Sequence, residues 1–439
     1  GLRNCQSVGR EWPSSKRKTG GHLVSKGAIG LTAGYWPEDV YRYLAIPGIS
    51  LDEALITRPA KRNPDRPALI SHKGTVTYRE LAAEIESTMK GLLSYSEGKS
   101  VRLALAVEEP IDLVKLIFAG LRGRCSLFLM DPGLPEEEMK RQLDQFGTDL
   151  VITDTAHLRQ MKSLPQSLQI IPFQDLQGKG DTIAVPKGRL DLQAPSIALA
   201  MENGSLVYHS HKSLLAGAVS WSTFVPLKAE DLMLCLQPLH KWEGLYSLLP
   251  IFFRGGACLM GSLDDPEMSA EAIRKHRPIY TILPRLEARK LYQSASRPLV
   301  HAFRESLSGL FVSVAGPFTA IGRRRLKNLL DRPALLMYGS EECGPVLSSH
   351  PTWYLDAAVG IPITNVDAWP LNPSTGKPLE VPWEAIEYGE IGVKSPMTAV
   401  GYQPAEEKEK RVHDGWVRTK IVPTMDPNGL FYVQSRVPD

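Results

Sequence analysis

The chain has 439 residues, of which 43% are hydrophobic and 23% charged, and its formal net charge is +3. This composition is typical of a soluble globular protein, the length excludes a single small core, and the charge neither demands nor excludes a polyanionic partner. Apolar stretches such as residues 245–253 are too short to span a bilayer. The five cysteines are scattered and form no C-x-x-C pair, which argues against a disulfide framework or a zinc site and favours a reducing compartment.

The first 34 residues differ from the rest of the chain. They carry six basic residues against one acid, Glu11. A start that is poor in acids and rich in Arg and Ser is similar to the remnant of an organelle presequence, which predicts a location in mitochondria or another organelle matrix. A disordered basic tail or a cloning scar would have the same composition. We therefore treat residues 1–49 as a basic N-terminal extension.

Strands and helices alternate from about residue 51. Residues 68–78 predict a β-hairpin that turns at Lys73-Gly74, and a helix follows with apolar residues at positions 81, 85, 89 and 92. The next elements are three strands separated by two helices, at residues 102–107, 110–123, 125–130, 134–147 and 149–154. Alternation of this kind predicts a largely parallel sheet that is covered on both faces.

The remainder of the chain predicts a second unit of the same class and a smaller one. Residues 164–195, with many Gln, Pro and Gly, are typical of a linker or surface excursion, and residues 356–439 are rich in strand and turn signals. The sequence therefore predicts an α/β fold with two stacked α/β subdomains, 50–195 and 196–355, and a small β-rich subdomain, 356–439.

Six segments in order resemble the large N-terminal domain of adenylate-forming enzymes, the superfamily of acyl-CoA synthetases and luciferases. They include "NPDRPALI…VTYRELA" (63–82), "MYGSEECG" (337–344) and "YGEIGVKSPMTAVGY…DGWVRT" (388–419). The resemblance covers residues 50–439 and implies the acyl-CoA synthetase-like fold. Such enzymes join a carboxylate to ATP, release pyrophosphate, and pass the acyl group to a thiol.

The segments that the resemblance assigns to the nucleotide depart from the family pattern. A short join between Met201 and His209 replaces the Gly/Ser/Thr loop that surrounds phosphates. Glu341 stands where a threonine hydroxyl is expected, and two like charges at about 4 Å repel by about 4 kcal/mol at an effective dielectric constant near 20. Ile421 replaces the aspartate that binds the ribose. The sequence also ends without the family's small lysine-bearing C-terminal domain, which we expect to be absent.

Four residues match positions that contact the nucleotide in the family. We interpret them as a vestigial nucleotide site, with Glu342 at the position of the expected Mg²⁺ ligand; they are Tyr338, Gly339, Glu342 and Arg436.

The resemblance also predicts an acyl pocket beside the nucleotide site. His240, Trp242 and Gly316 are its candidate residues, although a lone His near apolar strands is more often a core or rim residue. Gly309 stands where an arginine would bind the second carboxylate of malonate, which disfavours that substrate.

The cluster "GRRRLKN" (322–328) is the sharpest basic segment. Arg323, Arg324 and Arg325 are either one solvated helix face or a contact for RNA, acidic lipid or an acidic protein. His209 and His211 have no third partner that would complete a metal site, so we predict none.

The loss of nucleotide contacts in an otherwise intact core predicts a catalytically inactive protein. It would need no cofactor and would serve as a structural subunit or assembly factor bound to protein subunits of a larger mitochondrial complex, with an acyl or acyl-carrier ligand as a further candidate partner. The alternative is an active acyl-CoA synthetase-like ligase that uses ATP and Mg²⁺.

Overall fold

The computed structural model describes residues 35–159, 161, 164–178, 188–380 and 389–436, all within one compact unit that spans residues 33–439. The basic segment 1–34, with the location that it suggested, lies outside the described residues. Among the described helices, none is long and apolar enough to cross a lipid bilayer. The predicted α/β fold class is confirmed.

One large sheet has seven strands in the order β18-β8-β7-β4-β3-β5-β6. The strands from β7 to β6 are parallel, and β8 and β18 add to the edge in antiparallel pairings. Their bounds are β3 Arg102–Ala106, β4 Ser126–Leu129, β5 Leu150–Thr153, β6 Gln169–Pro172, β7 Pro195–Ala200, β8 Leu206–Ser210 and β18 Gly401–Gln403.

The second large sheet has nine strands in the order β15-β14-β13-β12-β11-β9-β10-β1-β2. Its six central strands are parallel. The bounds are β1 Pro67–Ser71, β2 Gly74–Thr77, β9 Leu232–Cys235, β10 Ala257–Met260, β11 Tyr280–Pro284, β12 Gly309–Ser313, β13 Ala334–Ser340, β14 Gly344–Ser348 and β15 Ile361–Pro362.

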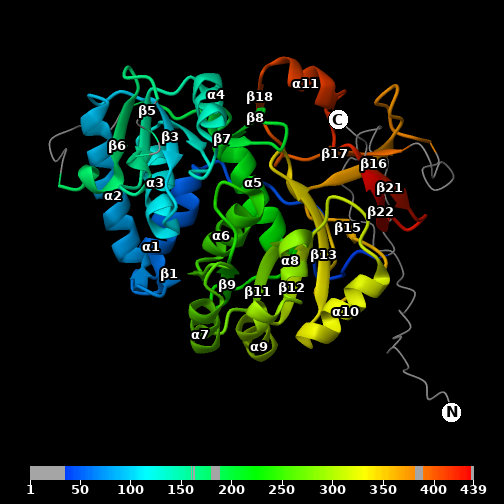
Figure 1. Cartoon of the computed structure of the whole chain (residues 1–439). Coiled ribbons are helices and arrows are strands. Elements are labelled where there is room, and N and C mark those ends of the chain that lie inside the picture. Colours follow the sequence, from blue (N-terminus) through cyan, green and yellow to red (C-terminus); the bar gives the residue numbers. More distant parts are fainter. Residues whose placement is uncertain (1–34, 160, 162–163, 179–187, 381–388, 437–439) are drawn as a thin grey trace, which may run out of the picture. The chain divides into compact units, whose positions relative to one another are not determined.

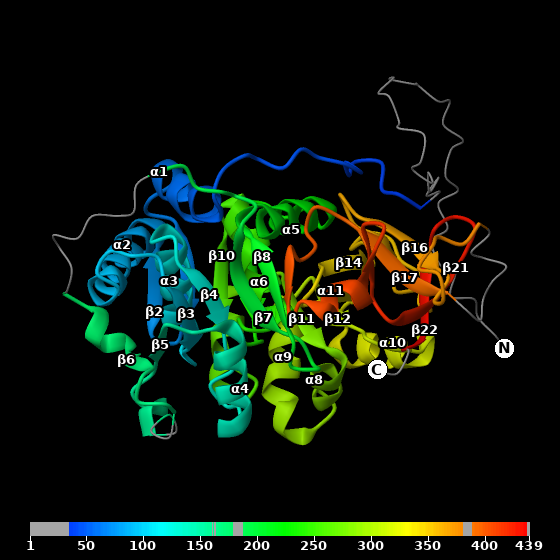
Figure 2. The same ribbon diagram turned by 90° about the horizontal axis from the view of Figure 1, so that it is seen from above.

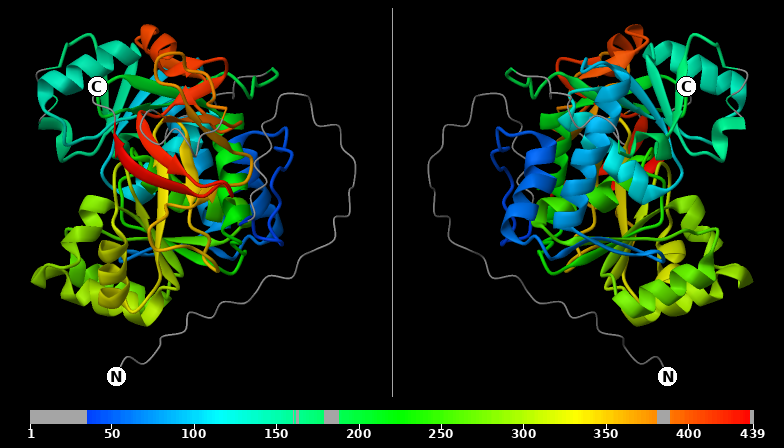
Figure 3. Two further views of the ribbon diagram at one scale, coloured as in Figure 1. Left: turned by 90° about the vertical axis from the view of Figure 1, so that its right-hand side faces the viewer. Right: turned by 90° about the vertical axis from the view of Figure 1, so that its left-hand side faces the viewer.

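Two small antiparallel sheets form the predicted β-rich part. The first contains β16 Asp367–Leu371, β17 Glu390–Lys394, β19 Val412–His413 and β20 Trp416–Arg418, and the second contains β21 Ile421–Met425 and β22 Phe431–Arg436. β21 contacts β16 and β17, and Figure 3 shows the red hairpin beside these orange strands.

The helices cover the large sheets as the strand–helix alternation predicts. Their bounds are α1 Arg58–Arg62, α2 Tyr78–Tyr95, α3 Pro110–Arg122, α4 Glu136–Phe146, α5 His211–Phe224, α6 Trp242–Arg254, α7 Pro266–His276, α8 Arg285–Lys290, α9 Arg297–Ser306, α10 Ala320–Leu330 and α11 Glu406–Arg411. Short π or 3₁₀ turns are Glu53–Thr57, His157–Arg159, Phe173–Leu176 and Ser294–Ser296.

Helix α5 packs on α6 and contacts both β8 and β14, so this helix pair lies between the two large sheets (Figures 1 and 2). Helices α7, α9 and α10 lie along the lower edge of Figure 1, where α7 contacts β10 and α10 contacts β13. Trp221 of α5 is fully buried and meets Phe311 of β12 edge-on, with ring centroids 5.2 Å apart. The apolar helix pair is therefore the shared core of both sheets.

Local sequence signals account for much of this arrangement. Helix α2 begins at a capping box, in which the Thr77 hydroxyl accepts from the Glu80 N–H and the Glu80 carboxylate accepts from the Thr77 N–H. The hairpin at 67–77 forms as predicted. Within the predicted linker or surface excursion, 164–195, the apolar residues 170–173 contribute to β6 and a 3₁₀ turn at the sheet edge.

The large sheets take strands from both sides of the predicted boundary at residue 195. Strands β1 and β2 precede it but pair in the nine-stranded sheet, whereas β7 and β8 follow it and pair in the seven-stranded sheet. The boundaries at 195 and 355 stay predictions.

Arg323 does not belong to a basic surface, which corrects that part of the predicted Arg323–Arg325 cluster. Its side chain is 1% exposed and donates to the Ala334, Leu355 and Ala358 carbonyls and the Ser349 hydroxyl at 2.6–3.0 Å. It joins α10 to β13 and to the segment that follows β14, because a buried guanidinium must have its donors satisfied.

We expect Arg323→Met to lower the free energy of unfolding by about 3 kcal/mol or more, because four acceptors lose their donors. Arg324→Met is the matched control: Arg324 is 62% exposed and lies 3.9 Å from Asp356, so its loss should change stability by less than about 0.5 kcal/mol. Urea denaturation of both variants measures the difference. Equal changes would contradict the structural role of Arg323.

Candidate functional site

A cavity of about 690 Å³ opens at the carboxyl ends of the central strands of the nine-stranded sheet. This is the edge where parallel α/β sheets place ligands. Its lining comes from the ends of β7, β9, β11, β12 and β13, the start of α6, the end of α11, and two residues near β20 and β21. The lining residues are Met201, Glu202, Asn203, Gln237, Lys241, Trp242, Glu243, Pro284, Arg285, Leu286, Glu287, Ser313, Val314, Ala315, Gly316, Pro317, Tyr338, Gly339, Ser340, Glu341, Glu342, Arg411, Thr419 and Ile421.

The cavity brings together most of the site residues that the sequence singled out. Tyr338, Gly339 and Glu342 line it with Trp242 and Gly316. A Cβ at position 339 would lie 2.7 Å from the Trp242 ring, so the glycine is needed for this close approach. The predicted nucleotide and acyl residues therefore share one wall.

Two predicted residues are placed differently. His240 is not among the lining residues; its Nε2 lies 3.7 Å from Asp131 Oδ2, and burial lowers its pKa to about 4, which keeps the ring neutral near pH 7. Arg436 pairs through its backbone with Ile421, and its side chain lies outside the described residues.

Glu342 lies at the centre of a buried polar network. Its side chain is 3% exposed; Oε1 accepts from the Tyr402 hydroxyl at 2.5 Å, and Oε2 lies 3.3 Å from Nη1 of Arg411. Burial raises the pKa of the Glu342 carboxyl, and the positive charge of Arg411 limits that rise. The two residues form a buried ion pair at the cavity wall.

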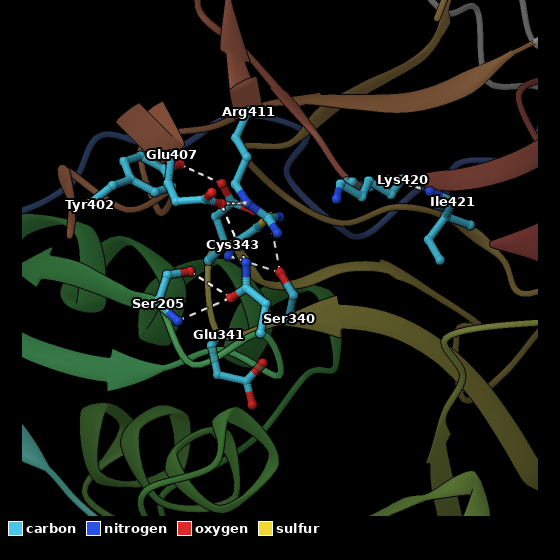
Figure 4. Close-up of polar contacts among 12 residues, drawn as sticks. Ser205, Ser340, Glu341, Cys343, Tyr402, Glu407, Arg411, Lys420 and Ile421 are labelled. Atoms are coloured by element: carbon cyan, nitrogen blue, oxygen red, sulfur yellow. Dashed lines mark hydrogen bonds and ion pairs between the residues drawn. The ribbon is translucent and has the colours of Figure 1, made fainter. Parts of the chain in front are cut away.

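Further contacts hold Arg411 in place. Its Nε donates to Glu407 Oε2 at 3.3 Å, and the same oxygen accepts from Asn203 at 3.4 Å. Asn203 lies in the tight turn between β7 and β8, where its Oδ1 accepts from the N–H and hydroxyl of Ser205. Figure 4 shows this chain of contacts running from α11 to the β7–β8 turn.

Glu341 points away from that network (Figure 4) and lines the cavity with Glu243. Burial, with a contribution from the nearby Glu243 carboxylate, raises the pKa of Glu341 to about 7. Near neutral pH this carboxyl is protonated in a large share of molecules and can then donate a hydrogen bond. The backbone carbonyl of Glu341 accepts from His209 Nε2 at 2.7 Å, which fixes the segment against β8.

Ile421 replaces the expected ribose acceptor with an apolar surface. It is 1% exposed and lines the cavity together with Thr419, whose hydroxyl donates to the Ile391 carbonyl at 2.8 Å. Lys420 has positive φ, and its N–H donates to Glu390 Oε1 at 2.6 Å. These contacts fix the turn that joins β20 to β21.

Three cationic residues of the cavity were missed by sequence reasoning: Lys241, Arg285 and Arg411. Arg411 ends the segment "EEKEKR", whose alternating charges are typical of a solvated helix. The i,i+4 spacing of Glu407 and Arg411 was the one available signal, and it gives no information about the partner Glu342 on another element.

A second, more open cavity of about 420 Å³ adjoins the first, with Arg285 and Pro317 in both linings. Arg289, Arg325 and the half-exposed Tyr292 also line it. Arg325 of the predicted basic cluster is thus on the surface, and contact with RNA or an acidic partner there stays a prediction.

Comparison with known proteins agrees with this geometry. A family model described as "AMP-binding enzyme" matches residues 56–195 and 206–403, which is most of the chain. The curated 4-coumarate–CoA ligase 5 of Oryza sativa is 23% identical over 430 residues, covering 90% of this chain and 77% of its own length. A feruloyl-CoA synthase of Amycolatopsis is 25% identical and covers 87% and 78%.

A solved structure supports the fold independently. O-succinylbenzoate coenzyme A synthetase from Bacillus subtilis, in complex with ATP and magnesium ion, superposes with a TM-score of 0.76 at 20% identity, over 87% of this chain and 79% of that one. The acyl-CoA synthetase-like fold and the predicted family resemblance are confirmed.

The prediction of a catalytically inactive structural subunit is wrong. The relatives named above match nearly the whole chain and are acid–CoA ligases, so they favour the active alternative. Glu341 is not a full anion near neutral pH, because burial raises its pKa to about 7. Three basic residues, Lys241, Arg285 and Arg411, line the same cavity together with the acidic residues Glu202, Glu243, Glu287, Glu341 and Glu342.

The pKa of Glu341 predicts how stability depends on pH. The pKa of Glu341 is about 7 in the folded state and near its ordinary value of 4.5 in the unfolded state. The protonated carboxyl therefore contributes to the free energy of unfolding at low pH, and this contribution is lost as the pH rises to about 7. Between pH 5 and pH 8 we expect wild type to lose about 2 kcal/mol more than Glu341→Gln. Urea unfolding at several pH values measures this.

Glu287→Gln is the control, since Glu287 lines the same cavity but is paired with Lys290 at 2.9 Å. This variant should follow the wild-type pH dependence. If the free energy of unfolding of Glu341→Gln changed with pH as steeply as that of wild type, the raised pKa of Glu341 would be contradicted.

Proposed function

The chain belongs to the AMP-binding enzyme family, and from this premise we propose that it is a carboxylic acid–CoA ligase that uses ATP. The observation that carries the proposal is the cavity, which is lined by the family's motif segments at the carboxyl ends of parallel strands. Its volume of about 690 Å³ is within the range of small-molecule sites.

The proposed reaction has two balanced steps. An oxygen of the substrate carboxylate forms a bond to the α-phosphorus of ATP while the bond to pyrophosphate breaks. The sulfur of CoA, having given up its proton, then bonds to the acyl carbon, and AMP leaves. Both steps develop negative charge on phosphate oxygens, so positive groups at the site lower their barriers.

Side-chain cations supply that positive charge in this proposal. Lys241, Arg285 and Arg411 line the cavity from three different elements. The β7–β8 turn contributes little, because the Gly204 N–H donates to the Met201 carbonyl at 2.9 Å and is not available to phosphate. A protonated Glu341 adds a hydrogen-bond donor where the family resemblance places a hydroxyl.

We propose an aromatic carboxylic acid as the substrate class. Trp242, Tyr338 and the small residues Ala315 and Gly316 line the cavity and together leave room for a flat ring. Relatives whose names specify 4-coumarate, ferulate and 2-succinylbenzoate support the same class. Mg²⁺ enters this proposal as the counter-ion of ATP.

We expect the full chain, given ATP, MgCl₂, CoA and an aromatic acid, to release pyrophosphate in an acid-dependent reaction. Gly316→Leu should lower kcat/KM for the acid by at least about tenfold, since the added side chain enters the cavity. The only atom near a Cβ at position 316 is Arg285 Nη1 at 3.9 Å, so the fold should tolerate the change. A coupled pyrophosphate assay over hydroxycinnamic, benzoic and fatty acids measures it.

Gly48→Leu is the matched control, because nothing lies within 4 Å of a Cβ there and the position is not in the cavity. This variant should retain wild-type kinetics. Absence of acid-dependent pyrophosphate release across the whole panel would overturn the proposed function.

A further inference from the structure

We propose that Arg411 is the resident counter-cation of Glu342 and that this carboxylate holds no divalent metal. The family resemblance places the Mg²⁺ ligand at Glu342, so its surroundings decide whether that assignment fits. The proposal about the ion pair stands on the geometry alone, and its consequence for nucleotide binding rests on the proposed function.

Both oxygens of Glu342 already have partners. Oε1 accepts from Tyr402 at 2.5 Å and Oε2 lies 3.3 Å from the Arg411 guanidinium. Mg²⁺ requires near-octahedral oxygen ligands and loses water reluctantly. A metal at Oε2 would stand against a permanent positive charge, since an arginine side chain does not lose its proton in proteins.

The neighbouring groups do not assemble a metal site. Within the part of the chain that the structure describes, there is no group of three or more His, Cys, Asp or Glu side chains able to hold a metal ion. Glu407 is the nearest further carboxylate of the network, but its oxygens accept from Arg411, Lys410 and Asn203. The donor set of this network therefore fits a guanidinium and does not fit Mg²⁺.

Because Glu342 and Arg411 are buried, each charge must be compensated by the other. The side chains of Glu342 and Arg411 are only 3% and 11% exposed, so neither charge can be left to solvent. Glu407 fixes the guanidinium from the other side, and Asn203 joins Glu407 to the β7–β8 turn. Arg411 is thus held in one orientation with its charge at the cavity wall, where a preorganised cation can act on phosphate oxygens.

For the proposed ligase, this means that the negative charge of Glu342 is neutralised within the protein and needs no metal ion to screen it from the phosphates of ATP. We expect ATP to bind the wild-type chain in EDTA and in MgCl₂ with affinities that differ by less than about threefold, because the protein-bound cation is always present. Without the guanidinium, the buried carboxylate would repel the phosphates unless a metal ion screened it.

The decisive test is Mn²⁺ binding to the full chain. Binding is measured as the decrease in the electron paramagnetic resonance signal of free Mn²⁺. The wild-type chain and Glu342→Gln should bind Mn²⁺ with the same affinity. Arg411→Gln should bind Mn²⁺ at least about tenfold more tightly than wild type, since Glu342 loses its counter-charge. The double variant with Glu342→Gln should lose this gain.

Two matched controls separate the role of Arg411 from a general loss of positive charge. Arg411→Lys keeps the cation and should resemble wild type. Lys410→Gln removes a charge from the adjacent residue, which is 67% exposed and contacts Glu407, and should also resemble wild type. Circular dichroism and urea unfolding check that each variant is folded.

A wild-type Mn²⁺ site that disappears in Glu342→Gln would overturn the proposal, and this comparison does not depend on the folding of any Arg411 variant. A folded Arg411→Gln that gains no Mn²⁺ affinity would overturn it as well.

Calorimetric titration of ATP in EDTA and in MgCl₂ tests the consequence for the nucleotide. Arg411→Gln should lose at least about tenfold more ATP affinity in EDTA than in MgCl₂. Failure of every variant to bind ATP would count against the proposed function, while the Mn²⁺ result would still decide the metal assignment.

Discussion

The buried pair of Glu342 and Arg411 is the interaction on which the site depends. Glu342 follows β13 in the nine-stranded sheet, Tyr402 lies on β18 at the edge of the seven-stranded sheet, and Arg411 ends α11. The segment that carries Tyr402 and Arg411 and the distant segment that carries Glu342 thus meet at one carboxylate. Because a buried charge must be compensated, their relative positions are constrained by electrostatics as well as by apolar packing.

The same constraint explains how one wall of the cavity is assembled. Strand β18 pairs with β8, which brings Tyr402 to the edge of the sheet, and the β7–β8 turn carries Asn203 to the partner of Arg411. The apolar core formed by α5 and α6 lies behind this wall. Polar contacts therefore set the orientation of the groups at the cavity, while apolar burial throughout both large sheets drives folding.

The inactive function predicted from the sequence is contradicted by relatives that are acid–CoA ligases, and Glu341 shows why residue types alone are a weak guide here. From residue types alone, each departure from the family pattern predicts a lost contact, and Glu341 predicts a fixed negative charge. In the structure burial raises the pKa of Glu341 to about 7, and Lys241, Arg285 and Arg411 converge on the same cavity. Ionisation and charge balance depend on three-dimensional surroundings, so residue types alone do not fix the charge of this site.

The sequence by itself determined the fold class, the hairpin at 67–77, the helix α2 that follows it, and the motif residues Tyr338, Gly339, Trp242 and Gly316 that meet at one cavity. These features depend on hydrophobic periodicity, local hydrogen bonds and ordered motifs, which are encoded over short stretches. Only the tertiary structure decided that Arg323 is buried while Arg324 is exposed, and that Arg411 is the partner of Glu342. Arginines in charged segments look alike in sequence, because burial and pairing are set by elements that lie far away along the chain.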